Sequence, residues 1–241
     1  MNLSEKIFLY CERGQNPAFW AEPLNALTNA AFIIAAMVAT WDYFAAPPER
    51  RTASAAALVL VTYVIGIGSF LFHTYATRWA SFADQIPIAV FMLAYFGFLL
   101  RRYLNLHWIF VILGLAAFFV AIRYAGTIEC KQAGLLPITA RAGARCLNGP
   151  AAYLPAFIAL AASALGLAII RHPAWRLLGI ASVVFLASMT FRTLDLEICE
   201  LSRVGGHLLG SHFMWHVLNA LTLYLLLRAS ILYGRPRGAP E

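Results

Sequence analysis

The chain alternates between long apolar runs and shorter polar segments. A helix needs roughly 20 mostly apolar residues to cross a bilayer, and seven runs approach this length. They lie at about 23–44, 53–72, 84–102, 106–124, 150–170, 175–191 and 207–233. Only helices or closed barrels satisfy backbone polar groups in lipid, and these runs are too uniformly apolar for barrel strands. The pattern therefore predicts an all-α bundle of seven transmembrane helices after an outer N-terminal segment, 1–22.

Composition supports an integral membrane protein. Of the 241 residues, 61% are hydrophobic and 12% are charged, whereas a soluble domain is about 45–50% apolar and about 25% charged. The length suits a single domain, 1–241, and no repeat of 20–50 residues is visible. The net charge of +7 fits basic loops. Nucleic-acid binding would need a basic patch on a folded platform, which the pattern lacks.

An odd number of helices places the two termini on opposite sides of the membrane. The four cysteines and the two long polar loops then lie on the N-terminal side, whereas the short turns on the other side are rich in arginine. The positive-inside rule weights short loops and helix ends, so it favours an outer N-terminus and a cytoplasmic C-terminus. Oxidation is permitted on the outer side, where Cys11–Cys199 and Cys130–Cys146 are candidate disulfides. Sequence alone leaves their connectivity open.

Several polar side chains lie within or beside the apolar runs, where ionisable groups are costly and usually functional. Helix counting places them at a similar depth, near the outer ends of the helices. They are Glu22 at the start of the first run, Ser69 and His73 at the end of the second, Asp84 at the start of the third, and His212 and His216 near the start of the seventh. We therefore expect these side chains to converge.

The spacing of the histidines indicates a metal site. Residues i and i+4 share a helical face, about 5–6 Å apart at Cβ, and His212 and His216 have this spacing. With His73 they form a three-nitrogen set, and a catalytic zinc has three protein ligands and one open position for water. Zinc lowers the pKa of that water to about 7 and polarises a carbonyl group. Asp84 would act as general base or orient a histidine, and Ser69 would hydrogen-bond the developing oxyanion or the water.

Three alternatives stay open for these histidines. Histidines within the membrane also form hydrogen bonds between helices. Histidines on two helices can ligate haem, although an i, i+4 pair directs both nitrogens toward one small ion. His207 could replace one zinc ligand, but it lies one turn further out and is expected to be a polar group at the end of a loop.

The residues around these positions resemble those of the alkaline ceramidase family. The segments SFLFHTYATRWASFAD and HFMWH carry the pattern S-x3-H, a later D, and H-x3-H. The segment YCERGQNPAFWAEPLNALTN resembles the ceramidase branch of a wider superfamily of seven-helix proteins, which includes the progestin and adiponectin receptors. The resemblance runs from about residue 10 to about residue 224, nearly the whole chain.

The resemblance implies a zinc hydrolase that cleaves the amide bond of ceramide, releasing sphingosine and a fatty acid. The site residues that it implies are a catalytic pair and three zinc ligands, namely Ser69 and Asp84 with His73, His212 and His216. Cys11 and Cys199 resemble the disulfide pair of the family.

A calcium site is a further implication of the resemblance. Glu12 and Glu22 match two carboxylates that bind calcium in the eukaryotic members, but the aspartate expected just before Tyr10 is absent. Because calcium takes six to eight oxygen ligands, the loss of one carboxylate weakens the case for this ion. The alternative is structural, since a carboxylate is favourable at a helix N-terminus and Glu22 precedes Pro23, a good first residue of a helix.

These features predict a zinc-dependent intramembrane amidase that hydrolyses the N-acyl amide bond of ceramide or a ceramide-like lipid to a long-chain amine and a fatty acid. The alternative is a receptor-like or lipid-sensing seven-helix protein with a structural zinc, because the receptor relatives share the same polar residues. Compact loops favour a bacterial inner membrane over an internal eukaryotic one. The partner is expected to be a membrane lipid. Its chain length and the oligomeric state stay open.

Overall fold

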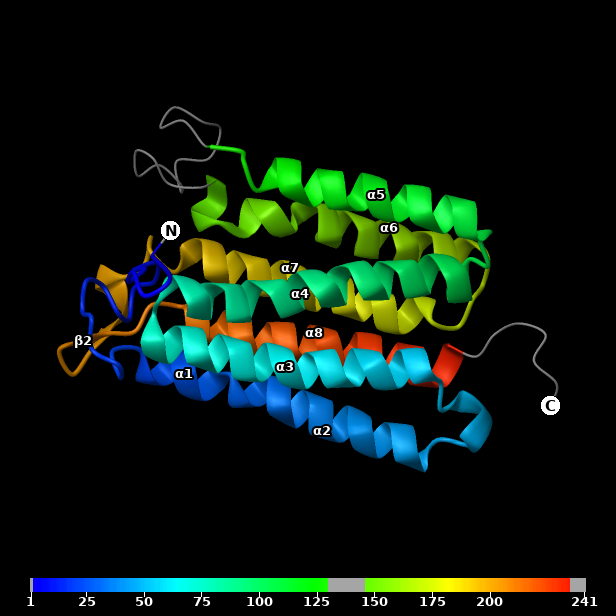
Figure 1. The fold of residues 1–241 in the computed structure, drawn as a ribbon, viewed down its shortest axis with the longest axis horizontal. Coiled ribbons are helices and arrows are strands. Elements are labelled where there is room, and N and C mark those ends of the chain that lie inside the picture. Colours follow the sequence, from blue (N-terminus) through cyan, green and yellow to red (C-terminus); the bar gives the residue numbers. More distant parts are fainter. Residues whose placement is uncertain (1, 130–145, 235–241) are drawn as a thin grey trace.

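Seven helical spans, counted over residues 2–129 and 146–234 that the computed structural model describes, run side by side along one axis (Figure 1). Each is long and apolar enough to cross a membrane, which confirms the predicted all-α membrane bundle. The helices are α1 (Pro23–Thr28), α2 (Ala30–Ala45), α3 (Ala53–Tyr75), α4 (Arg78–Phe98), α5 (Trp108–Ala125), α6 (Leu154–Ile169), α7 (Trp175–Leu194) and α8 (His212–Tyr233).

Short elements complete the spans and their connections. The first span is α1 followed by α2, with a break at Asn29, and the third is α4 continued by a π-helical turn. The short helical turns and strands are η1 (Pro48–Arg50), the π turn η2 (Leu99–Tyr103), η4 (Cys146–Asn148), η5 (Pro150–Tyr153), η6 (Glu200–Ser202), β1 (Arg203–Val204) and β2 (His207–Leu208).

The third span begins earlier than the predicted 84–102, because α3 and α4 are separated by only two residues. Ala76 adopts a left-handed conformation with φ of 48° and ends α3. The first N–H groups of α4 have no partner within the helix, and the N-terminal segment supplies acceptors for them. Arg78 N donates to Glu5 O at 3.0 Å, and Trp79 N donates to Leu3 O at 3.1 Å.

The seventh span begins at His212 and not near residue 207 as predicted. β1 and β2 form an antiparallel hairpin before it, in which Val204 pairs with His207. Gly205 and Gly206 make its turn with φ of 57° and 85°, values that glycine adopts readily and that suit a two-residue hairpin turn. His207 is exposed on β2, so it does not reach the buried histidines of α8.

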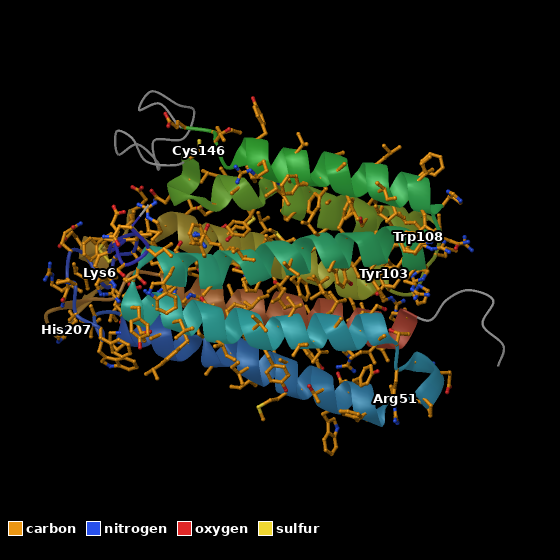
Figure 2. All side chains as sticks on the ribbon, in the orientation of Figure 1. Lys6, Arg51, Tyr103, Trp108, Cys146 and His207 are labelled. Atoms are coloured by element: carbon orange, nitrogen blue, oxygen red, sulfur yellow. A yellow bond between two sulfur atoms is a disulfide. The ribbon has the colours of Figure 1, made fainter. Side chains whose placement is uncertain are left out.

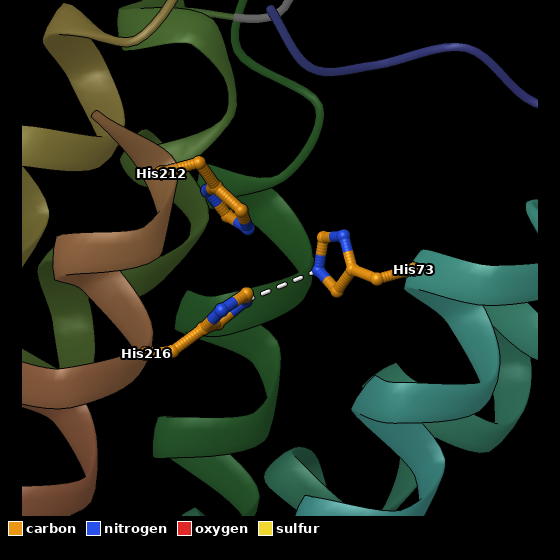
Figure 3. Close-up of side chains that lie close together, drawn as sticks. All are labelled: His73, His212 and His216. Atoms are coloured by element: carbon orange, nitrogen blue, oxygen red, sulfur yellow. Dashed lines mark hydrogen bonds between the residues drawn. The ribbon is translucent and has the colours of Figure 1, made fainter. Parts of the chain in front are cut away.

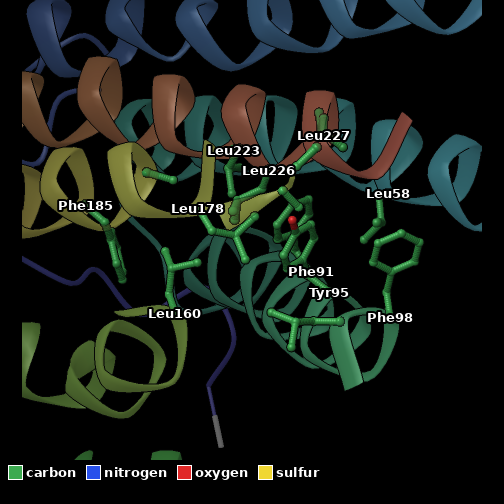
Figure 4. Close-up of a cluster of buried hydrophobic side chains, with 14 of the residues drawn as sticks. Leu58, Phe91, Tyr95, Phe98, Leu160, Leu178, Phe185, Leu223, Leu226 and Leu227 are labelled. Carbon is green, nitrogen blue, oxygen red and sulfur yellow. The ribbon is translucent and has the colours of Figure 1, made fainter. Parts of the chain in front are cut away.

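α8 lies at the centre of the bundle, where it packs against α2, α3 and α7, and it is the most buried of the spans (Figure 1). A cluster of aromatic and aliphatic side chains fills the space around it (Figure 4). The outward faces of the other helices carry exposed apolar residues, such as Ile34, Val64 and Ile112, as expected for helices in contact with lipid.

The two ends of the bundle differ in the segments that lie over them. Lys6 and His207 mark one end, while Arg51, Tyr103 and Trp108 mark the other (Figure 2). At the first end, segment 2–22 and loop 195–211 lie over the end of α3 and the starts of α4 and α8. We call segment 2–22 and loop 195–211 the cover, and we call this end of the bundle the site end, because the candidate functional residues lie just beneath the cover.

Candidate metal centre

Three histidines meet just below the site end. His73 comes from the last turn of α3, and His212 and His216 come from the first two turns of α8 (Figure 3). Their ring nitrogens lie within 4.8 Å of one another, and each ring is 1% exposed. The i, i+4 spacing on α8 places two imidazoles on one face, as expected from helix geometry, and α3 presents the third opposite them.

Hydrogen bonds set the orientation of two of these rings. His73 Nδ1 lies 2.6 Å from the Glu22 carboxylate, which accepts from it. Thr28 Oγ1 lies 2.8 Å from Leu24 O and 2.9 Å from His216 Nδ1. A hydroxyl has one proton, so we assign Thr28 as the donor to the carbonyl and the acceptor from His216. In both rings Nδ1 then carries the proton and Nε2 carries a lone pair.

This arrangement fits a metal ion. The Nε2 atoms of His73 and His216 are 3.1 Å apart, and two lone pairs at that distance repel each other unless a cation lies between them. A tetrahedral zinc with bonds of about 2.0–2.1 Å separates its ligand nitrogens by about 3.3 Å. The third ring supplies a buried Nδ1 atom, on His212, that has no hydrogen-bond partner among the described residues. Outer-shell bonds from a carboxylate and a hydroxyl are typical of histidine ligands.

Ser69 and Asp84 lie beside the histidines, as the sequence indicates. Ser69 is one turn before His73 on α3, and both Ser69 and Asp84 are buried. The Asp84 carboxyl group interacts with the Ser69 hydroxyl and with the His73 ring. Within the part of the chain that the structure describes, its Oδ1 atom has no hydrogen-bond partner, so one carboxyl oxygen is available to a bound water or substrate.

Gly68 explains how these two helices come so close. A Cβ atom at this position would lie 2.0 Å from Ala83 O and 3.3 Å from Asp84 N. The backbone of α4 therefore lies directly against α3 one residue from Ser69. Only glycine permits this approach, which joins Ser69 and Asp84 across the helix pair.

Glu22 belongs to the histidine site in this structure. One oxygen accepts from His73 Nδ1 and from Asn25 Nδ2, and the other accepts from Arg13 Nε. Burial opposes the charged form of Glu22, but the neighbouring His73 and Arg13 outweigh it, and the pKa of the carboxyl group is lowered. The carboxylate therefore links the N-terminal segment to a candidate metal ligand.

Glu12 caps a helix. Its two carboxylate oxygens accept from Leu24 N at 2.7 Å and Asn25 N at 2.8 Å, which are N–H groups of the first turn of α1. Burial raises its pKa, although these backbone N–H groups act in the opposite direction. With Glu12 turned to the helix and Glu22 turned to His73 and Arg13, this pair of carboxylates does not fit a calcium ion.

Asp195 fastens the cover to the start of α8. Its oxygens accept from Cys11 N at 3.0 Å, Ser211 N at 2.8 Å and His212 N at 2.9 Å. Burial raises the pKa of Asp195, and the three N–H groups act in the opposite direction. A carboxylate here is also favoured by the N-terminus of α8.

A disulfide joins the same two segments. Cys11 on the N-terminal segment is bonded to Cys199 in loop 195–211, as the resemblance implied. The other candidate pair includes Cys130, which lies outside the described residues. The bond links two parts of the cover that are 188 residues apart in sequence.

Two residues near the centre are not among the site residues that the sequence predicts. The Tyr10 ring stacks on His212 with centroids 3.7 Å apart, and burial raises the pKa of its phenol so that it stays neutral. Arg192 lies over three aromatic rings, with its Cζ atom 4.9 Å from the Trp215 ring, 5.3 Å from Tyr153 and 5.8 Å from Tyr10. Neither follows from helical periodicity, since Tyr10 lies on an irregular segment and Arg192 lies at a helix end.

An apolar cavity of about 80 Å³ begins one turn below the histidines. Asn219, three residues after His216, and Ile65, four residues before Ser69, lie on its wall. Its lining continues down the bundle to Leu226 and is made mostly of aliphatic and aromatic side chains from α4, α6, α7 and α8. An apolar chain placed here would have its end close to the polar site.

Comparisons with known proteins agree with this arrangement. No curated protein matches the chain. The family model described as Ceramidase matches residues 9–235, which include the three histidines, the serine and aspartate pair, and both cysteines of the disulfide. The chain therefore belongs to the ceramidase family.

Proposed function

We propose that the chain is a zinc-dependent amidase that hydrolyses the N-acyl amide bond of ceramide or a ceramide-like lipid within the membrane. The observation that carries the proposal is the convergence of three histidine nitrogens beside Ser69 and Asp84 in a chain of the ceramidase family. The products would be a long-chain amine and a fatty acid. The burial of the site and the apolar cavity below it support a lipid as the substrate.

His73, His212 and His216 would hold the zinc ion. When bound, zinc supplies a water of lowered pKa and polarises the amide carbonyl group. Glu22 and Thr28 would hold two of the ligand rings in place through their Nδ1 atoms.

Asp84 would act as the general base and acid. Its unpartnered oxygen would accept a proton from the attacking water and pass it to the amide nitrogen as the carbon–nitrogen bond breaks. Ser69 would donate a hydrogen bond from its hydroxyl group to the carbonyl oxygen as negative charge develops there. Because Gly68 packs α3 directly on α4, these two groups act on one small volume.

The apolar cavity would take the inner part of a lipid chain. It lies against Asn219 and Ile65, one turn below the proposed reacting groups. Its volume is about 80 Å³. Arg192 would supply a positive charge near the site for the carboxylate of the product.

We propose that the site end faces the outer side of the membrane. The Cys11–Cys199 disulfide lies at this end, and disulfides persist where the compartment is oxidising. The arginines of the short turns at the other end would then face the cytoplasm, in line with the positive-inside rule.

The test is fatty-acid release by purified protein in detergent from a panel of N-acyl sphingoid bases and other N-acyl lipids. Asp84→Asn and Ser69→Ala should each lower turnover at least 100-fold while the fold is retained. Ser182→Ala is the matched control, because this buried serine of α7 donates to Leu178 O of its own helix, and it should keep wild-type turnover. If the zinc-loaded wild type releases no fatty acid from any lipid of the panel, the amidase proposal is contradicted and the receptor-like alternative is favoured.

A further inference from the structure

The most buried charge of the N-terminal segment is that of Arg13. Its side chain is fully buried, although it lies on an irregular segment at the site end. A buried guanidinium is costly unless all its N–H groups are bonded and its charge is neutralised. The structure meets both requirements, so the residues around Arg13 form a binding site for a cationic group.

Five oxygen atoms surround this guanidinium. Nε donates to the Glu22 carboxylate. The other donors reach four carbonyl oxygens, those of Asn16 at 3.1 Å, Ala18 at 2.7 Å, His73 at 2.9 Å and Thr74 at 3.2 Å. The set therefore has one carboxylate and four carbonyl oxygens, and it joins the N-terminal segment to the end of α3.

A set of carboxylate and carbonyl oxygens from separate segments is the kind that a calcium ion takes. Here the set is filled by N–H donors, and the nearby carboxylate of Glu12 is bonded to the start of α1. The resemblance implied a calcium ion in this region of the chain. In this structure the cationic side chain of Arg13 is bonded to Glu22, one of the two carboxylates that the resemblance assigned to that ion.

We propose that Arg13 is a built-in cation that replaces a structural calcium ion in this protein. It neutralises Glu22, holds segment 2–22 on the end of α3, and keeps the chain folded without any divalent ion at this position. The Glu22 carboxylate that Arg13 holds also accepts from His73 Nδ1 at 2.6 Å. The stability claim does not depend on the reaction that the protein catalyses.

Wild-type protein gives the first half of the test. The thermal midpoint Tm is measured in detergent with EGTA, with 1 mM calcium chloride and with 1 mM magnesium chloride, and calcium binding is measured by equilibrium dialysis. We expect Tm to change by less than about 1 °C with calcium and no stoichiometric calcium to bind. A saturable rise in Tm with calcium, together with one bound ion per chain, would overturn the proposal.

Variants give the second half. Arg13→Ala leaves Glu22 buried and unpaired, so in EGTA its Tm should fall by about 10 °C, and millimolar calcium should restore part of that loss by entering the vacated oxygen set. Arg78→Ala is the matched control, because Arg78 pairs with Glu5 at the exposed surface of the same segment. Its Tm should fall by less than about 3 °C.

If Arg13→Ala keeps the wild-type Tm in EGTA, the proposal is wrong. If that variant does not fold, the wild type still decides between Arg13 and calcium as the cation at this position, because a calcium site would bind the ion and raise Tm. Arg13→Lys keeps the charge but loses the planar fork of donors, so its Tm should lie between those of Arg13→Ala and the wild type.

Discussion

The contact of Gly68 with α4 allows a quantitative prediction for Gly68→Ala. The added Cβ atom would lie 2.0 Å from Ala83 O, whereas an ordinary contact begins at 3.4 Å. The two helices must therefore move apart by about 1.4 Å, since both colliding groups belong to rigid helices. Overpacking a well-packed interior costs about 1–3 kcal/mol, and a backbone collision belongs at the upper end of this range.

The same shift has a separate consequence for activity. It moves Ser69 away from Asp84, and a misplacement of about 1 Å in a catalytic group lowers turnover by about 100-fold. We therefore expect Gly68→Ala to lower the free energy of unfolding by about 3 kcal/mol and to lose about 99% of its activity even where it is folded.

The assay compares this variant with Gly166→Ala. Gly166 lies in α6, and a Cβ atom there meets nothing within 4 Å, so the control makes the same chemical change in a transmembrane helix without a collision. Tm by intrinsic fluorescence and amide hydrolysis at a temperature well below Tm are measured for both. If Gly68→Ala matches Gly166→Ala in Tm and turnover, the close approach of α3 and α4 is not needed, and the reasoning fails.

Three further changes test the hydrogen bond to His216, the backbone contacts of Asp195 and the disulfide. Thr28→Val removes the hydroxyl that orients His216, so zinc affinity measured by chelator competition should fall about 10–100-fold, and an unchanged affinity would contradict this role. Asp195→Asn weakens three hydrogen bonds to backbone N–H groups and should lower the free energy of unfolding in detergent by about 2 kcal/mol; wild-type stability would show that these bonds contribute nothing. Replacing Cys11 and Cys199 together by serine should lower it by about 2–4 kcal/mol and abolish any effect of reductant on Tm, whereas a reductant effect that persists must come from another bond.

The number of helices could be predicted from the sequence because apolar run length is a strong signal. The starts of α4 and α8 at the site end could not be predicted in this way, because each depends on how an irregular segment folds beside the helix. Residues 78–83 precede the predicted third run, yet they form the start of α4, where the N-terminal segment supplies acceptors for the first N–H groups. The last predicted run begins at about 207, although Gly205 and Gly206 turn the chain into a hairpin whose second strand is His207–Leu208.

The histidine set could be predicted because i, i+4 spacing and helix counting both depend on regular geometry. The roles of Arg13, Tyr10 and Arg192 could not, because each depends on how an irregular segment folds over the bundle. Glu22 shows the difference most clearly. The resemblance implies that Glu22 binds calcium. In the structure its carboxylate instead accepts hydrogen bonds from His73 and Arg13.

The most direct test of the central claim is the metal content of the purified chain. Zinc per chain is measured by mass spectrometry for the wild type, for His216→Ala and for His107→Ala, a control whose histidine lies at the other end of the bundle, at the start of α5. The account predicts nearly one zinc per chain in the wild type and in the control, and almost none in His216→Ala. Equal zinc in all three proteins, or no zinc in the wild type after loading, would contradict it.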